Sequence, residues 1–266
     1  MSENIIAVII GIVEGLTEFL PISSTGHMIL VGSLLGFEGE KASVFEVFIQ
    51  LGAILSVFIL YRDKFFEMLR PRPINIYSGR LTVMHVLAGI IPVMGVGFVL
   101  HKPIKTYLFS PYTVIIGLIA GAILMLVAEK TCKRPVTRDV DHMTVKQALV
   151  VGLFQILSLW PGFSRSGSTI AGGLFLGMSR KAAAEFSFII AVPLMLVACV
   201  YDLLKIWNTL SMDDFTMIII GFVVAFITAY LSIVWFLRFL NNSTLASFAY
   251  YRFVVAGLAY YYFFLR

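Results

Sequence analysis

The chain has 266 residues, of which 59% are hydrophobic and 13% are charged, and its mean hydropathy is +0.94. Soluble domains carry about 25% charged residues, so this composition excludes an ordinary soluble protein and indicates an integral membrane protein. The net charge of +5 is concentrated in two loops, so it reports on membrane topology and predicts no nucleic-acid partner. The two cysteines, Cys132 and Cys199, indicate neither a disulfide framework nor a metal–thiolate site.

The first segment, residues 5–36, is apolar but interrupted at "LPISSTG". It lacks a basic start and contains Glu14 and Glu18, so we interpret it as part of the mature fold rather than a signal peptide. Its length suits two short helices joined by a break. A second segment of the same kind, residues 148–178, is broken at "WPGFSRSG".

Each broken segment is followed by three apolar runs long enough to span a bilayer. The chain is therefore predicted to be an all-α membrane protein with six transmembrane helices and two helical hairpins, the spans covering residues 47–61, 81–100, 112–128, 186–201, 215–237 and 248–265.

The loops predict the orientation of the chain in the membrane. Loops 62–80 and 129–147 are rich in lysine and arginine, which places them in the cytoplasm. Loops 37–46 and 202–214 are net acidic, as expected on the outer side.

An internal repeat relates the two halves, approximately residues 1–128 and 142–266, of a single membrane domain covering residues 1–266. An ungapped shift of 141 residues gives eight identities in the 26 positions from 11 to 36, four of them glycine. Three crossings per half require the second half to be inverted relative to the first. Inverted repeats with interrupted segments predict a binding site near the bilayer midplane.

The two broken segments are predicted to be re-entrant hairpins whose polar tips meet inside the protein. Irregular backbone is tolerated at membrane depth only where protein or trapped water satisfies it. The helices that follow the breaks then point their N-termini at one place, which suits an anion such as phosphate.

Glu14 and Glu18 are four residues apart, so a helix places both on one face. Ionisable residues inside membrane segments are rare and usually functional. Two neighbouring carboxylates repel each other unless they share a proton, a cation or a basic partner. A bound Mg²⁺ or Ca²⁺ that also contacts a phosphate would meet this need.

Ser23, Ser24 and Thr25 offer hydroxyl groups for nucleophilic attack or hydrogen bonding. His27 follows Ser24 by three residues, close enough to activate it or to protonate a leaving group. Alternatively, His27 has a structural role, as a buried histidine whose hydrogen bonds are satisfied within the protein.

Arg165 lies inside the second broken segment, where a guanidinium needs an anionic partner. Its donors fit two phosphate oxygens; the alternative is an ion pair with Glu14 or Glu18. Ser164, Ser166 and Thr169 are further candidate phosphate donors. Carboxylates, hydroxyls, a histidine and an arginine together favour phosphoryl transfer on a lipid substrate over ion conduction.

The stretches "EGLTEFLPISSTGH" and "PGFSRSGST" resemble the two signature motifs of the undecaprenyl-diphosphate phosphatase family, also called bacitracin resistance proteins. The resemblance covers essentially the whole chain. It implies hydrolysis of a C55 isoprenyl diphosphate to the monophosphate and phosphate, which recycles the lipid carrier for peptidoglycan and other envelope polymers. It also implies a bacterial inner-membrane protein whose site opens to the periplasm, contact with membrane lipids, and a homodimer.

The resemblance further implies roles for individual residues. Ser24 would be the nucleophile with His27 as its acid–base partner, although His27 itself or water are alternative nucleophiles. Arg165 would clamp the diphosphate, and Glu14 and Glu18 would hold a divalent cation or orient the hydroxyl. Phosphate oxygens would be bound by the remaining motif residues, namely Ser23, Thr25, Gly26, Ser164, Ser166 and Thr169.

Two other functions are alternatives to this one. The acid-phosphatase-like lipid phosphatases share a Ser-Gly-His and a Ser-Arg element, but none of the other histidines follows "SRSG" at the spacing that those enzymes need. A lipid transporter or flippase is the alternative that the inverted repeat suggests.

Overall fold

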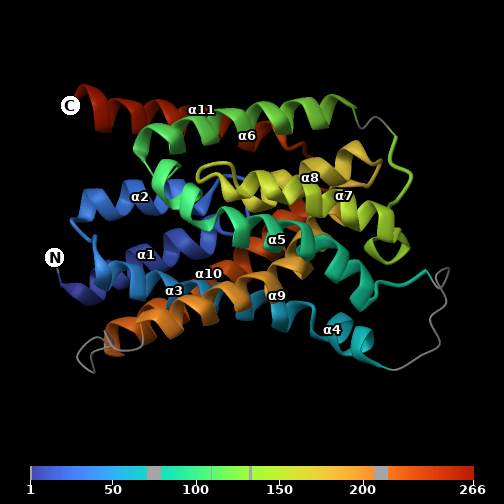
Figure 1. The fold of residues 1–266 in the computed structure, drawn as a ribbon, viewed down its shortest axis with the longest axis horizontal. Helices are drawn as coiled ribbons and strands as arrows, with labels where there is room; N and C mark the ends of the chain where they lie inside the picture. The colour runs from blue at the N-terminus through green and yellow to red at the C-terminus, as the bar shows by residue number, and fades with distance from the viewer. Residues whose placement is uncertain (1, 71–78, 109, 132–133, 207–214) are drawn as a thin grey trace.

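A computed structural model of the chain describes residues 2–70, 79–108, 110–131, 134–206 and 215–266. Within these ranges every regular element is a helix (Figure 1). In chain order these are α1 (Glu3–Thr17), α2 (Ser24–Leu35), α3 (Glu40–Leu60), α4 (Arg62–Leu69), α5 (Val83–Tyr107), α6 (Pro111–Thr131), α7 (Val145–Gln155), α8 (Arg165–Phe175), α9 (Arg180–Ile206), α10 (Phe215–Phe239) and α11 (Ala246–Tyr260), with short 3₁₀ turns at Val140–His142 and Ile156–Leu159 and a π-helical turn at Tyr261–Leu265.

Five helices of the described chain, α3, α5, α6, α9 and α10, are long and apolar enough to cross a membrane. The predicted all-helical membrane class is therefore confirmed. Large apolar side chains such as Phe98 and Leu258 project outward, 89% and 61% exposed, as on a surface that faces lipid. The sixth predicted span is less extended as an α-helix, because α11 has 15 residues and continues directly into the π-helical turn.

The two broken segments form two hairpins, α1 with α2 and α7 with α8, and both breaks have the same backbone geometry. Ser23 and Ser164 are the only non-glycine residues of the described chain with positive φ, at +71° and +74°. Each caps the helix that follows: its side chain accepts a hydrogen bond from the backbone N–H three residues on, at Gly26 and Gly167. These two serines are equivalent positions under the shift of 141 residues.

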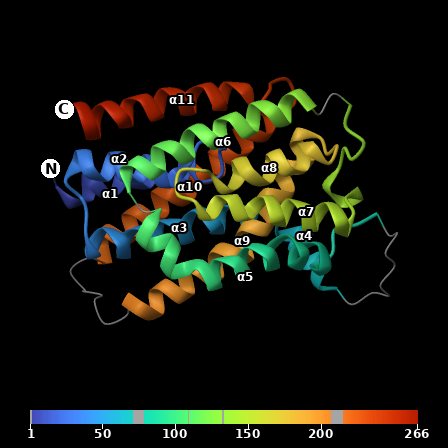
Figure 2. The same cartoon turned by 45° about the horizontal axis from the view of Figure 1, so that its top comes forward.

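Each hairpin packs against a long helix from the other half of the chain: α1 against α10, and α7 against α5 (Figures 1 and 2). Glycines permit the close approach. A Cβ on Gly11 would lie 2.9 Å from the carbonyl oxygen of Gly221, and one on Gly152 would lie 2.6 Å from that of Gly89. Small residues at helix crossings are typical of membrane proteins, where van der Waals packing drives helix association.

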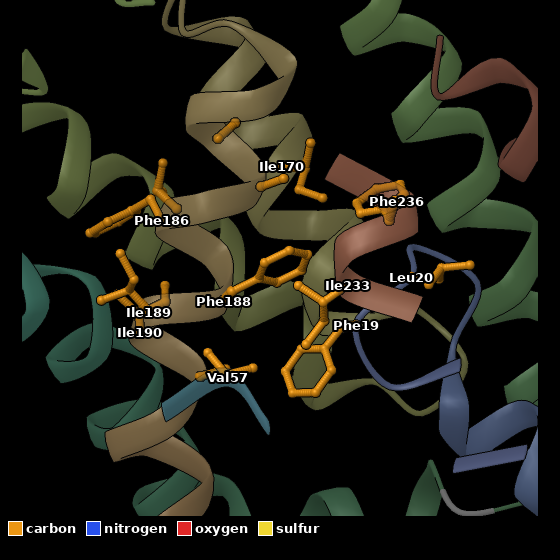
Figure 3. Packing of buried hydrophobic residues seen from close by; sticks show 14 of the residues in the cluster. Phe19, Leu20, Val57, Ile170, Phe186, Phe188, Ile189, Ile190, Ile233 and Phe236 are labelled. Carbon is orange, nitrogen blue, oxygen red and sulfur yellow. The ribbon is translucent and has the colours of Figure 1, made fainter. Parts of the chain in front are cut away.

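The core lies beneath the first break, where α9 and α10 meet the loop after α1 (Figure 3). Phe19 packs edge-on against Phe188 with ring centroids 5.5 Å apart, and Phe188 lies 6.1 Å from Phe236. All three side chains are fully buried. Phe19 adjoins Glu18 in the sequence, so this packing fixes the backbone that carries the carboxylate.

Several predicted loops contain helix. α3 starts at Glu40, inside predicted loop 37–46, and α9 continues to Ile206. Loop 62–80 begins with α4, which is amphipathic and packs Phe65 and Met68 against the core. The remaining parts of the charged loops, residues 71–78, 132–133 and 207–214, lie outside the described residues, and so does Cys132.

Candidate active site

The two breaks meet. The hydroxyl of Ser166, in the second motif, donates a hydrogen bond of 2.9 Å to the carbonyl oxygen of Leu20, in the first. Between the breaks lies a polar cavity of about 150 Å³, lined by Glu18, Ser23, Ser24, Thr25, Gln50, Ser158, Trp160, Pro161, Gly162, Ser164 and Arg165. Drug-sized pockets are about 300–1,000 Å³, so this cavity suits a small polar head group rather than a whole lipid.

Glu18 is the centre of the cavity's hydrogen-bond network. Its Oε2 accepts a hydrogen bond of 2.5 Å from the Ser24 hydroxyl, and its Oε1 pairs with Arg165 Nη2 at 3.1 Å. The side chains of Glu18 and Arg165 are 8% and 11% exposed. A carboxylate that accepts a hydrogen bond from a hydroxyl lies within reach of its proton.

Arg165 begins α8 and is fixed from three sides. Besides Glu18, its Nη1 donates 3.0 Å to the carbonyl oxygen of Ser187 on α9, and its guanidinium carbon lies 5.4 Å from the centre of the Phe19 ring. The ion pair with Glu18 is the alternative that the sequence left open. Longer contacts join Nη1 to Ser187 Oγ at 3.5 Å and Nη2 to Met195 Sδ at 3.6 Å. Arginine has five N–H donors, and Nε has no hydrogen-bond partner among the described residues, so it is available to an anion.

Glu14 lies one turn before Glu18 on α1 and is 1% exposed. Its Oε1 is buried and has no hydrogen-bond partner among the described residues. The described chain has no group of three or more His, Cys, Asp or Glu side chains arranged for a metal. A Mg²⁺ ion commonly uses one or two carboxylates together with substrate phosphates and water. Glu14 and Glu18 are two carboxylates one helical turn apart, but only Glu18 lines the cavity, and its two oxygens already contact Ser24 and Arg165.

His27 does not pair with Ser24 in this structure, although both residues are on α2. Its Nδ1 hydrogen-bonds the carbonyl oxygen of Ser23 at 2.8 Å, and its Nε2 hydrogen-bonds the hydroxyl of Tyr251 on α11 at 2.8 Å. The two rings also stack, with an interplanar angle of 5°. This arrangement matches the alternative of a histidine with satisfied hydrogen bonds.

The predicted phosphate donors divide into two groups. Ser23, Thr25 and Ser164 line the cavity. Ser166 and Thr169 are fully buried and join helices instead: Thr169 donates 2.7 Å to the Ser187 hydroxyl. Gly26, Glu14 and His27 also lie outside the cavity lining.

The N-terminal ends of two helices face this cavity. Its lining includes the cap and first residue of α2, Ser23 and Ser24, and those of α8, Ser164 and Arg165. The N–H groups of a first helical turn have no partner within the helix, and the helix dipole favours negative charge there. Both helices therefore favour an anion in the cavity.

Although the backbone of the two breaks is alike, their chemistry differs. The positions equivalent to Glu14 and Glu18 are Gln155 and Leu159, and the position equivalent to Arg165 is Ser24. The two carboxylates and Ser24 thus come from the first hairpin and Arg165 from the second. Neither hairpin alone contains the whole set.

Sequence reasoning missed several residues around the site. Gln50 on α3 and Ser158 line the cavity, and Tyr251 and Arg252 on α11 contact the motifs. Gln50 and Arg252 each interrupt an apolar run, so the criterion that selected Arg165 would also have selected them.

A larger cavity of about 360 Å³ lies elsewhere, lined by residues that include Arg138 and Lys181 but none of the motif residues. The smaller cavity is the candidate active site, because the carboxylate, hydroxyl and guanidinium groups converge on it.

Comparisons with known proteins agree with the motifs. The family described as "Bacitracin resistance protein BacA" matches residues 7–258. The chain is 53% identical over 258 residues to undecaprenyl-diphosphatase 1 of Bacillus thuringiensis (strain Al Hakam), covering 97% of both chains. It is 49% identical over 262 residues to an undecaprenyl-diphosphatase of Nitratidesulfovibrio vulgaris (strain DP4), covering 98% of this chain and 99% of the relative. The resemblance found in the two motifs is thereby confirmed, and the chain belongs to the BacA family of bacitracin resistance proteins.

Proposed function

We propose that this protein hydrolyses undecaprenyl diphosphate to undecaprenyl phosphate and inorganic phosphate, and so recycles the lipid carrier for peptidoglycan and other envelope polymers. Its relatives at 49–53% identity are named undecaprenyl-diphosphatases. The structural observation that carries the proposal is the chain of contacts from Ser24 through Glu18 to Arg165 in a cavity at two helix N-termini.

The reaction begins with attack of the Ser24 oxygen on the terminal phosphorus. Glu18 takes the hydroxyl proton as the Ser24 O–P bond forms and the P–O bond to the bridging oxygen breaks. Undecaprenyl phosphate leaves as an anion. Its second pKa is about 6, as for other phosphate monoesters, so its departure does not depend on a strong general acid.

The second step returns the enzyme to its starting state. Glu18 first gives up the proton it took from Ser24, to the departing product or to water. The free carboxylate then accepts a proton from the water molecule that attacks the phosphoserine, and it passes this proton to the Ser24 oxygen as the Ser24 O–P bond breaks and phosphate is released. Throughout, Arg165 and the first-turn N–H groups of α2 and α8 stabilise the charge on the phosphoryl oxygens. Preorganised donors of this kind are usually the largest single contribution to catalysis.

We also propose that the protein uses a divalent cation. Glu14 and Glu18 would hold Mg²⁺ or Ca²⁺, which would neutralise part of the charge on the diphosphate. The partnerless Oε1 of Glu14 supports this assignment.

His27 has a different role here from the one inferred from sequence. Because Glu18 already accepts the Ser24 proton and Tyr251 engages Nε2, His27 fixes α2 against α11 and thereby orients Ser24.

We further propose six spans, with α11 as the sixth, and two re-entrant hairpins in an inverted repeat, in the inner membrane with the site open to the periplasm. The matched positive φ of Ser23 and Ser164 and the reciprocal packing of α1 on α10 and α7 on α5 support the repeat. Labelling a Ser24→Cys variant from each face tests the sidedness, and labelling from the cytoplasm alone would contradict it. A homodimer, implied by the family, is tested by the mass of the detergent-solubilised protein.

The decisive experiment measures phosphate release from undecaprenyl diphosphate by purified protein in detergent. Wild type should release phosphate, and folded Ser24→Ala and Arg165→Ala variants should lose several orders of magnitude of activity. If wild type releases none, the hydrolase proposal fails and the cavity must be explained as a lipid transport pathway.

A further inference from the structure

Arg252 on α11 is the largest fully buried side chain of the described chain, with 0% exposure. It lies outside both signature motifs, 87 residues after Arg165 in the sequence. In both views α11 runs beside α6, and α8 lies on the other side of α6 (Figures 1 and 2). Its side chain contacts Gly162 of the second motif, although α11 contributes no residue to the cavity lining.

The guanidinium of Arg252 binds three backbone carbonyl oxygens. Nε donates 3.1 Å to Leu118, and Nη2 donates 3.1 Å to Gly117 and 2.9 Å to Gly162. Leu118 and Gly117 are on α6, whereas Gly162 is in the break that leads into α8. Arg252 thus holds the second motif and α6 together, because one guanidinium donates hydrogen bonds to both.

Glycines on α6 make room for this contact. A Cβ on Gly121 would lie 2.8 Å from the guanidinium carbon of Arg252 and 2.5 Å from the carbonyl oxygen of Phe163. A Cβ on Gly117 would collide with the carbonyl oxygen of Pro161. Gly162 itself has a φ of +90°, a conformation that L-residues with side chains rarely adopt. The loop that contains Gly162 therefore packs closely between α6 and the guanidinium of Arg252.

Arg252 carries a charge that the protein does not neutralise locally. Among the ion pairs of the described residues none involves Arg252. Burying a charge without a paired counter-charge is costly. The three carbonyl oxygens offset part of this cost, and an anion bound in the cavity that Gly162 lines would supply the opposite charge that they lack.

From these contacts we infer that Arg252 is a positioning residue for the phosphate site. It fixes the 161–164 loop through Gly162, so that Ser164 and Arg165 face the cavity, and its charge favours an anion there. The inference rests on the proposed phosphatase function and adds to it a residue that does not itself touch the substrate. Its neighbour Tyr251 binds His27, so α11 braces both motifs through adjacent side chains.

The test uses full-length protein in detergent and the variants Arg252→Lys, which keeps the charge but not the planar fork, and Gly121→Ala, which keeps Arg252 but displaces it. Gly257→Ala is the matched control, because a Cβ there meets nothing within 4 Å. For each variant we would measure the thermal midpoint, kcat and KM for undecaprenyl diphosphate, and the inhibition constant of inorganic phosphate.

Both variants should raise KM and the phosphate inhibition constant by about fivefold or more, while Gly257→Ala leaves them unchanged. Hydrogen–deuterium exchange of the peptide covering residues 160–168 should be faster in Arg252→Lys than in wild type. A purely structural role would lower the amount of active enzyme but leave KM, the inhibition constant and the exchange of that peptide as in wild type, and that result would overturn the inference. Loss of phosphate release by wild type itself would instead refute the proposed function.

Discussion

The contact between Ser24 and Glu18 makes a sharp prediction for the substitution Glu18→Gln. A carboxylate presents two acceptor oxygens, here used by Ser24 at 2.5 Å and by Arg165 at 3.1 Å. A glutamine amide has one acceptor oxygen and one donor NH₂ group. If the oxygen remains on Arg165, the NH₂ group faces Ser24 and cannot take its proton.

The expected loss follows from the role of a general base, which contributes about 10²- to 10⁴-fold to a rate. At 1.36 kcal/mol per tenfold change, this loss corresponds to about 3–5 kcal/mol of transition-state stabilisation. Glu18→Gln preserves the side-chain volume, but it also removes the counter-charge of the buried Arg165 guanidinium, so some loss of stability is expected as well. Activity is therefore compared only among samples that are folded at the assay temperature.

The assay is phosphate release from undecaprenyl diphosphate in detergent, with the thermal midpoint measured on the same samples. Glu38→Gln, at an exposed position, is the control and should retain wild-type activity. Glu18→Asp, which keeps the charge but shortens the reach to Ser24, should fall between wild type and Glu18→Gln. A folded Glu18→Gln protein that keeps activity within tenfold of wild type would refute Glu18 as the base.

Three further outcomes are expected. Gly15→Ala should destabilise the protein by about 1–3 kcal/mol, since its Cβ would lie 2.7 Å from the carbonyl oxygen of Ala225; Gly257→Ala should be nearly neutral in the same thermal unfolding experiment, and equal effects would contradict the packing argument. At Ser164, with φ at +74°, valine should cost about 1–3 kcal/mol of stability and glycine only a few tenths; a valine variant as stable as the glycine variant would be inconsistent with the strained backbone. A chelator should lower activity reversibly, and Mg²⁺ or Ca²⁺ added in the presence of inorganic phosphate should raise the thermal midpoint of wild type but not of Glu14→Gln; an unchanged wild-type midpoint under these conditions would exclude the metal site.

Local sequence properties are sufficient to predict the membrane class, most of the long helices, the two breaks and several candidate site residues. Composition and run length are sufficient to identify the membrane class and five of the long helices, because the bilayer imposes length and apolarity on any helix that crosses it. The two breaks were also predictable, since proline close to serine and glycine disfavours a continuous helix. Proline alone is not sufficient, because Pro92, Pro103 and Pro193 lie inside α5 and α9. Polar side chains within apolar segments then identified Glu18, Ser24 and Arg165 as candidates without any knowledge of their contacts.

Only the tertiary structure decided which of these groups act on one another. Arg165 reaches Glu18 across 147 residues of sequence, and Tyr251 reaches His27 across 224. The spacing of Ser24 and His27 suggested a pair, but a helix places both backbones on α2 without fixing where either side chain finds its hydrogen bond. The burial of Ser166 and Thr169 likewise depends on how α8 packs against its neighbours. Which groups hydrogen-bond to one another depends on three-dimensional packing. For that reason the sequence determined the candidate residues of the site, whereas only the fold determined which of them are in contact.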